Sequence, residues 1–117
     1  MSNPKEMMNN FNNGIKEIAS TNGEALNEFM KFVGANYKDG VVDAKTKELI
    51  AIGIAVYARC EHCIVHHVQR AYAAGATKEE LMESAFVAVS FGGGPSLTLI
   101  ATLLKDAVNT FAPDFNK

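Results

Sequence analysis

An unbroken apolar run from Leu49 to Ala58 sets the strongest limit on how this chain can fold. A helix that crosses a bilayer takes about 20 apolar residues, so this run is too short to span a membrane. As a helix, Ile50 to Tyr57 would be apolar on every side and would need protein around all of it. Because a domain of 117 residues has little core to offer, this pattern predicts a neighbouring subunit.

The remaining apolar residues recur at helical spacing, and no segment shows sustained strand alternation. We therefore predict an all-α fold, with residues 1–117 forming one small domain of about six helices. Helices are expected over about residues 4–18, 21–37, 44–58, 60–74, 77–91 and 96–111.

Helix starts are predicted from capping residues, and helix ends from glycine and proline. The start signals are Asn3 with Pro4, Thr21 with Glu24, Asp43, and Thr77 with Glu80; the stop signals are Gly40, Gly75 and Pro113. The run Gly92–Pro95 follows a helix and lacks the Lys-Ser/Thr ending of a phosphate loop. We interpret it as a hinge between helices.

Charge and composition exclude several classes of function. The net charge is −2 and no basic block appears, so we expect no nucleic-acid partner. The first residues lack the pattern of a secretory signal, and with the short apolar run this predicts a soluble, cytoplasmic protein without a membrane partner. In a reducing cytosol, a close cysteine pair is more often redox-active or metal-binding than a structural crosslink.

Both cysteines lie in a Cys-x-x-Cys motif that is followed by a histidine. On a helix each residue advances by about 100°, so Cys60, Cys63 and His67 would share one face. We expect Cys60 to be exposed in the first turn of the helix over about residues 60–74. Free N–H groups and the helix dipole favour a thiolate at that position. His67 follows Cys63 by one turn and could take its proton.

A neutral imidazole needs a partner that orients it. Glu48 precedes Cys60 on the preceding helix and could bind His67 if the two helices pack as an antiparallel pair. Thiol, imidazole and carboxylate would then act as nucleophile, base and orienting group. Cys60 would resolve a sulfenic acid on Cys63 by closing a disulfide.

Glu48, Cys60-Glu61-His62-Cys63 and His67, with their spacings, resemble the signature of alkylhydroperoxidase D (AhpD) and the carboxymuconolactone decarboxylase superfamily. The resemblance runs from about Asp43 to Thr77. It implies an all-helical fold, assembly into trimers or hexamers, and a hydroperoxide reductase with no cofactor or bound metal.

The resemblance also implies roles for single residues. Cys63 matches the attacking sulfur and Cys60 the resolving one, while Glu48, His62 and His67 match the proton relay. A hydroperoxide would be the substrate, and an external dithiol or thiol protein would restore the pair. The decarboxylases of the superfamily generally lack these cysteines.

Other interpretations stay open at this point. The cysteines could be inert core residues, or could form a zinc site with His67 and Glu48, although no second ligand pair exists. On residue type alone, Glu48 would be a solvated first-turn acid, and His66 would be a surface or subunit-contact residue. The chain could also be a disulfide carrier for a partner, or a cysteine-independent lyase on a small lactone acid.

Overall fold

The structure is a computed structural model that describes residues 3–117, and all regular structure in that range is helical, which confirms the all-α class. In chain order the elements are α1 (Pro4–Asn36), α2 (Ala44–Tyr57), α3 (Glu61–Ala73), α4 (Lys78–Phe86), α5 (Val89–Leu99), the π-helix η1 (Ile100–Leu104), α6 (Lys105–Phe111) and the 3₁₀-helix η2 (Ala112–Phe115). None of the described helices is long and apolar enough to cross a membrane.

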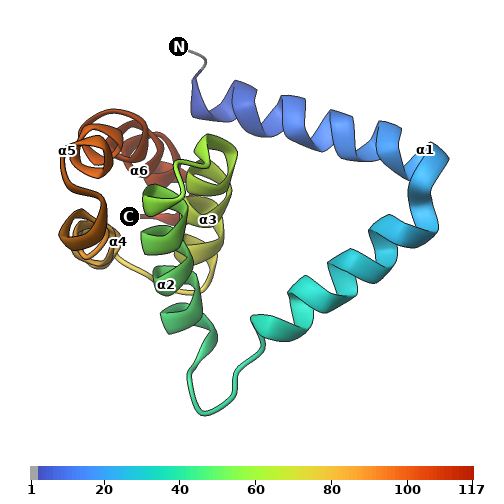
Figure 1. Ribbon diagram of the computed structural model, residues 1–117, viewed down its shortest axis with the longest axis horizontal. Helices are drawn as coiled ribbons and strands as arrows, with labels where there is room; N and C mark the ends of the chain where they lie inside the picture. Colours follow the sequence, from blue (N-terminus) through green and yellow to red (C-terminus); the bar gives the residue numbers. More distant parts are fainter. Residues whose placement is uncertain (1–2) are drawn as a thin grey trace.

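The first element, α1, joins what the sequence predicted as two helices. Its start is as predicted, with the side chain of Asn3 accepting the N–H of Glu6 at 2.8 Å. The predicted capping box at Thr21 does not form, because the Thr21 hydroxyl bonds back to the Ile18 carbonyl, but the helix does break at the next residue. Only Asn22 is non-helical (φ −124°, ψ 37°). The helix bends there into two stretches, and the bend stands away from the other helices (Figure 1).

Helices α2 and α3 form the centre of the molecule. Asp43 caps α2 by accepting the Thr46 N–H at 2.8 Å, as predicted. Helix α3 ends before Gly75, which has φ 99°, and this confirms the predicted stop. The short link between the two helices folds α3 back along α2, so the start of α2 lies beside the end of α3.

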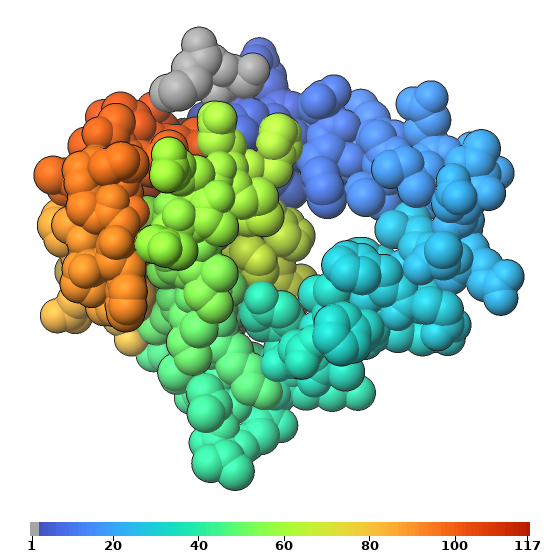
Figure 2. Space-filling view, in the orientation of Figure 1, coloured from blue at the N-terminus to red at the C-terminus, as the bar shows by residue number. Residues whose placement is uncertain are grey.

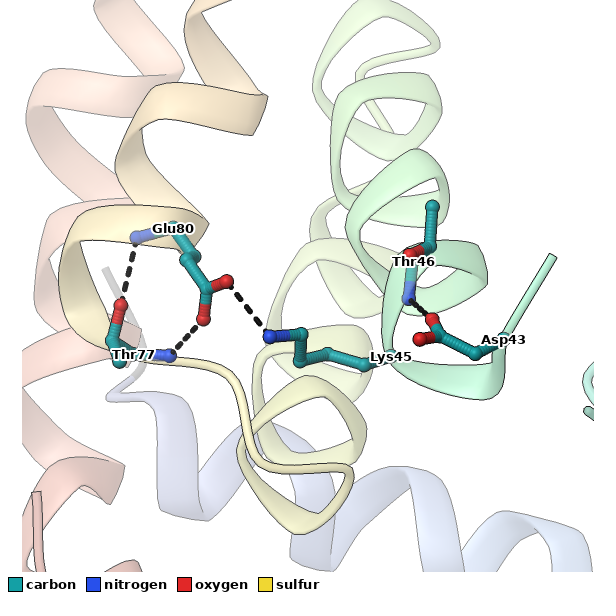
Figure 3. A network of polar contacts seen from close by, with 5 residues as sticks. All are labelled: Asp43, Lys45, Thr46, Thr77 and Glu80. Atoms are coloured by element: carbon teal, nitrogen blue, oxygen red, sulfur yellow. Dashed lines mark hydrogen bonds and ion pairs between the residues drawn. The ribbon is translucent and has the colours of Figure 1, made fainter.

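The starts of α2 and α4 are tied together by one acidic side chain. Thr77 and Glu80 form the predicted capping box, each side chain bonding to the other residue's N–H. The second carboxylate oxygen of Glu80 accepts from Lys45 Nζ at 2.9 Å (Figure 3). Lys45 lies one helical turn before Glu48, so this contact helps to fix the part of α2 that carries Glu48.

The C-terminal half differs from the prediction in where its helices break. Helix α4 stops at Phe86, because the N–H groups of Val87 and Ala88 bond three residues back and tighten the last turn. Helix α5 then runs through the glycine segment. The hinge is confirmed at Gly93, whose φ of 60° and ψ of −139° interrupt the helix.

The core lies where α2, α3 and the C-terminal helices meet. Its fully buried side chains include Ile52, Val56, Ile64, Val65, Leu81 and Phe111. The opposite side of α2 is open in the single chain, where Ile50, Ile54 and Tyr57 are 52%, 62% and 55% exposed. With Val87 and Phe91 these side chains line an apolar groove of about 560 Å³ between α2 and the α4–α5 segment.

Candidate active site

The two cysteines lie at the start of α3 and are joined by a disulfide. Cys60 is the N-cap residue, outside the first turn where the sequence placed it, and is only partly exposed. Its sulfur accepts the N–H of Cys63 at 3.3 Å, as a capping oxygen would. Cys63 is partly buried and packs against the hydrophobic core. The motif is therefore built into the end of a helix that the core holds in place.

Glu48 and His67 meet between the antiparallel helices α2 and α3. Glu48 is 3% exposed, and its Oε1 lies 2.7 Å from Nδ1 of His67. Burial works to raise the pKa of Glu48, but the hydrogen bonds from His67 and Arg70 outweigh it and hold that pKa below the usual value. An ionised carboxylate can only accept, so it orients the imidazole with the proton on Nδ1. His67 lies one turn after Cys63 on the same helix face.

Two further residues, Arg70 and Tyr37, form a cluster with Glu48 and His67, and the sequence analysis did not predict them. Arg70 Nε lies 2.9 Å from the second oxygen of Glu48. The guanidinium of Arg70 lies over the ring of Tyr37, 5.4 Å from its centroid, and this ring is 5.6 Å from that of His67. Arg70 could have been found, because it follows His67 by three residues on the same helix face. Tyr37 gave no such signal, because it comes from the end of α1.

The other two histidines lie on the side of α3 that faces α1. His62 is exposed, with its ring 6.4 Å from that of Phe11, and no described contact joins it to Glu48. His66 is partly buried, and its ring is 6.1 Å from Phe11 and 5.2 Å from His67. Burial lowers the pKa of His66, and the neighbouring His67 and Arg70 lower it further. His66 is thus partly covered by α1 within the single chain.

The described residues contain no group of three or more acidic, histidine or cysteine side chains arranged to hold a metal ion. The four side chains weighed as zinc ligands are instead engaged in two separate interactions. The cysteine sulfurs bond to each other, and Glu48 pairs with His67 and Arg70.

The sequence model of the carboxymuconolactone decarboxylase family matches residues 23–106, which include every residue of this cluster. The chain belongs to the carboxymuconolactone decarboxylase family. An uncharacterised protein of Cupriavidus necator, H16_B0147, is 30% identical over 107 residues, covering 90% of this chain and 95% of the relative.

Solved structures of the carboxymuconolactone decarboxylase family share the fold. A family protein from Legionella pneumophila, solved in its apo form, is 36% identical with a TM-score of 0.88, covering 93% of this chain and 96% of that one. A family protein from Thermotoga maritima, for which a part in an antioxidative response is suggested, is 25% identical with a TM-score of 0.74. That match covers 96% of this chain and 97% of the other.

Proposed function

We propose that this member of the carboxymuconolactone decarboxylase family is a thiol-dependent alkyl hydroperoxide reductase. The observation that carries the proposal is a cysteine pair one helical turn from an imidazole that a buried carboxylate already binds. This is the arrangement of nucleophile, base and orienting group that activates a thiol. The antioxidative role suggested for the Thermotoga maritima relative agrees with it.

In the proposed reaction, His67 takes the proton of the Cys63 thiol. The thiolate attacks the distal oxygen of a hydroperoxide and the O–O bond breaks, which oxidises the sulfur to a sulfenic acid and releases an alcohol that receives a proton from the imidazolium. The Cys60 thiol then attacks this sulfenic acid, closing the disulfide and releasing water.

A dithiol must then reduce the disulfide by exchange, becoming a disulfide itself and returning two thiols to the chain. The residues beside the pair, Arg59, Glu61 and His62, are exposed, which leaves room for an external dithiol or a thiol protein to approach. We expect His62, which is exposed between the cysteines, to exchange protons with solvent during this step.

The test is hydroperoxide consumption, with an excess of dithiol, by Cys63→Ser and Cys60→Ser variants. We expect Cys63→Ser to lose all turnover. Cys60→Ser, reduced beforehand and then freed of dithiol, should consume about one equivalent of hydroperoxide and accumulate a sulfenic acid that a carbon-acid reagent labels at Cys63. Full turnover by Cys63→Ser would overturn the proposal. Dithiol-dependent reduction of disulfides without peroxide consumption would instead identify a disulfide carrier.

The family match favours a second candidate, a lyase that acts on a small lactone acid. This reaction would not need the cysteines. Activity on such a substrate that survives replacement of both Cys60 and Cys63 would establish it in place of the reductase.

We also propose that the chain forms a homo-oligomer, a trimer or hexamer as the family resemblance implies. The exposed apolar side of α2 supports this, and so does α1, where Phe29 and Phe32 are 60% and 67% exposed. Figure 2 shows a hollow between the bent middle of α1 and the other helices, although α1 contacts α3 near both of its ends, through Phe11 and Tyr37.

A further inference from the structure

Arg70 and Tyr37 lie beside the proposed thiol-activating pair, yet they have no part in the reaction steps above. Glu48 uses one carboxylate oxygen for His67 and the other for Arg70, at 2.7 Å and 2.9 Å. The Glu48 side chain is 4% exposed and that of Arg70 is 44% exposed. A permanently charged group at the edge of the protein therefore reaches inward to a buried carboxylate.

Tyr37 fixes where that charge lies. A guanidinium can turn freely at a surface, but here it stacks over the ring of Tyr37 at 5.4 Å. The same ring lies against His67, with 31° between the two planes. Three elements thus meet here: the end of α1 supplies the ring, α2 the carboxylate, and α3 both the imidazole and the guanidinium.

The hydrogen bond from Arg70 to Glu48 bears on which nitrogen of His67 carries the proton. An ionised Glu48 must accept from Nδ1–H, which leaves Nε2 of a neutral His67 unprotonated and able to act as a base. A protonated Glu48 could donate to Nδ1 instead, and a neutral His67 would then carry its proton on Nε2. Arginine stays charged at any relevant pH, so its presence favours the first arrangement.

We propose that Arg70, seated on the ring of Tyr37, is a positioning residue that keeps Glu48 as an acceptor and so selects the tautomer of His67 with Nε2 free. The inference deepens the proposed reductase function, on which its catalytic meaning rests. The tautomer itself can be measured whether or not the chain reduces peroxides.

The experiment is ¹⁵N NMR of the imidazoles and ¹³C NMR of the Glu48 carboxyl group, on the intact oxidised protein across pH. In the wild type we expect the neutral form of His67 to carry its proton on Nδ1, with Nε2 free. In Arg70→Gln the Glu48 carboxyl should titrate at least about one pH unit higher, because burial persists and the cation is gone. The pure Nδ1–H tautomer should be lost.

Conservative variants separate positioning from charge alone. Arg70→Lys should restore most of the Glu48 titration, because the charge remains, but should restore the tautomer less completely without the planar group. Lys105→Gln removes an equally positive but exposed side chain and should change neither signal. Tyr37→Phe keeps the ring and should match the wild type, whereas Tyr37→Leu should shift both signals in the direction of Arg70→Gln.

Activity gives a second readout. If the wild type reduces hydroperoxides, Arg70→Gln should lower kcat by about tenfold or more and change KM little, because substrate binding is not what Arg70 serves. The proposal is overturned if folded Arg70→Gln keeps both the His67 tautomer and the Glu48 titration of the wild type. If Arg70→Gln does not fold, the same result in Tyr37→Leu overturns it. A wild type without peroxidase activity but with the expected NMR shifts would contradict the reductase function and leave the positioning role standing.

Discussion

At the scale of single residues, Arg59 holds a conformation that suits glycine. Its φ is 55°, and the N–H groups of Arg59 and Cys60 bond back to carbonyls at the end of α2. Glycine is the usual residue at such a helix end, because a side chain there costs about 1 kcal/mol or more. The strained residue directly precedes Cys60, the first cysteine of the disulfide.

We expect Arg59→Gly to raise the free energy of unfolding by about 0.5–1 kcal/mol, since relief of strain outweighs the extra freedom of glycine in the unfolded chain. Urea unfolding of the oxidised protein measures this. Arg59→Ala, which keeps the strained conformation but loses the charge, is the matched control and should change stability little. Equal effects of the two variants would show that φ is not the cause.

How much of the site could be predicted also depends on the residue. Cys60, Cys63 and His67 follow from spacing along one helix, which is a local property. The contact between Glu48 and His67 required an assumption about helix pairing that the structure bears out. Tyr37 could not be found in the sequence, because its approach to Arg70 depends on where the bend at Asn22 sends the end of α1.

At the scale of the elements, the predicted capping box formed at the start of α4 but not within α1. Thr77 with Glu80 forms a capping box, but Thr21 with Glu24 does not, because the Thr21 hydroxyl bonds back to the Ile18 carbonyl just before the bend at Asn22. The glycine segment was located correctly as a break between helices, but the continuation of helix within the segment on both sides of Gly93 was not predicted. A glycine indicates that the backbone can adopt many conformations at that position, but it does not indicate which conformation the backbone adopts.

Gly92 and Gly94 lie in this segment and differ in their surroundings. A Cβ on Gly92 would come within 2.1 Å of the Ser96 hydroxyl and 3.3 Å of the Tyr57 ring, whereas one on Gly94 meets nothing within 4 Å. We expect Gly92→Ala to lower the free energy of unfolding by about 1–3 kcal/mol through overpacking. Gly94→Ala should leave it unchanged or slightly higher. Thermal unfolding compares them, and equal losses would contradict the packing explanation.

At the scale of the whole molecule, the apolar run that limited the fold is buried on one side only. Ile52 and Val56 lie in the core, and Ile50 and Ile54 point away from it. The sequence indicated that the run needs cover on every side, but not which surface would supply it. In the single chain this side of α2 is left exposed.

We expect the wild type to sediment as a multiple of its 12.6 kDa chain mass, and Ile54→Glu to sediment as the monomer at micromolar concentration. A buried, unpaired charge in an apolar contact is strongly unfavourable, whereas on a free surface it costs little. Helical content by circular dichroism should stay the same. Val41→Glu is the control, because Val41 is fully exposed in the link before α2. A wild-type monomer at this concentration would refute the assembly.

The sulfur that caps α3 has one more consequence. Cys60 Sγ accepts the Cys63 N–H while it is part of the disulfide, and a thiol or thiolate sulfur can accept the same bond. The first turn of the helix therefore has a partner for this amide in every oxidation state. If the pair cycles between disulfide and dithiol as proposed, the first turn of α3 keeps its capping partner in both states, and we expect the amide hydrogen of Cys63 to stay slow to exchange with solvent in both.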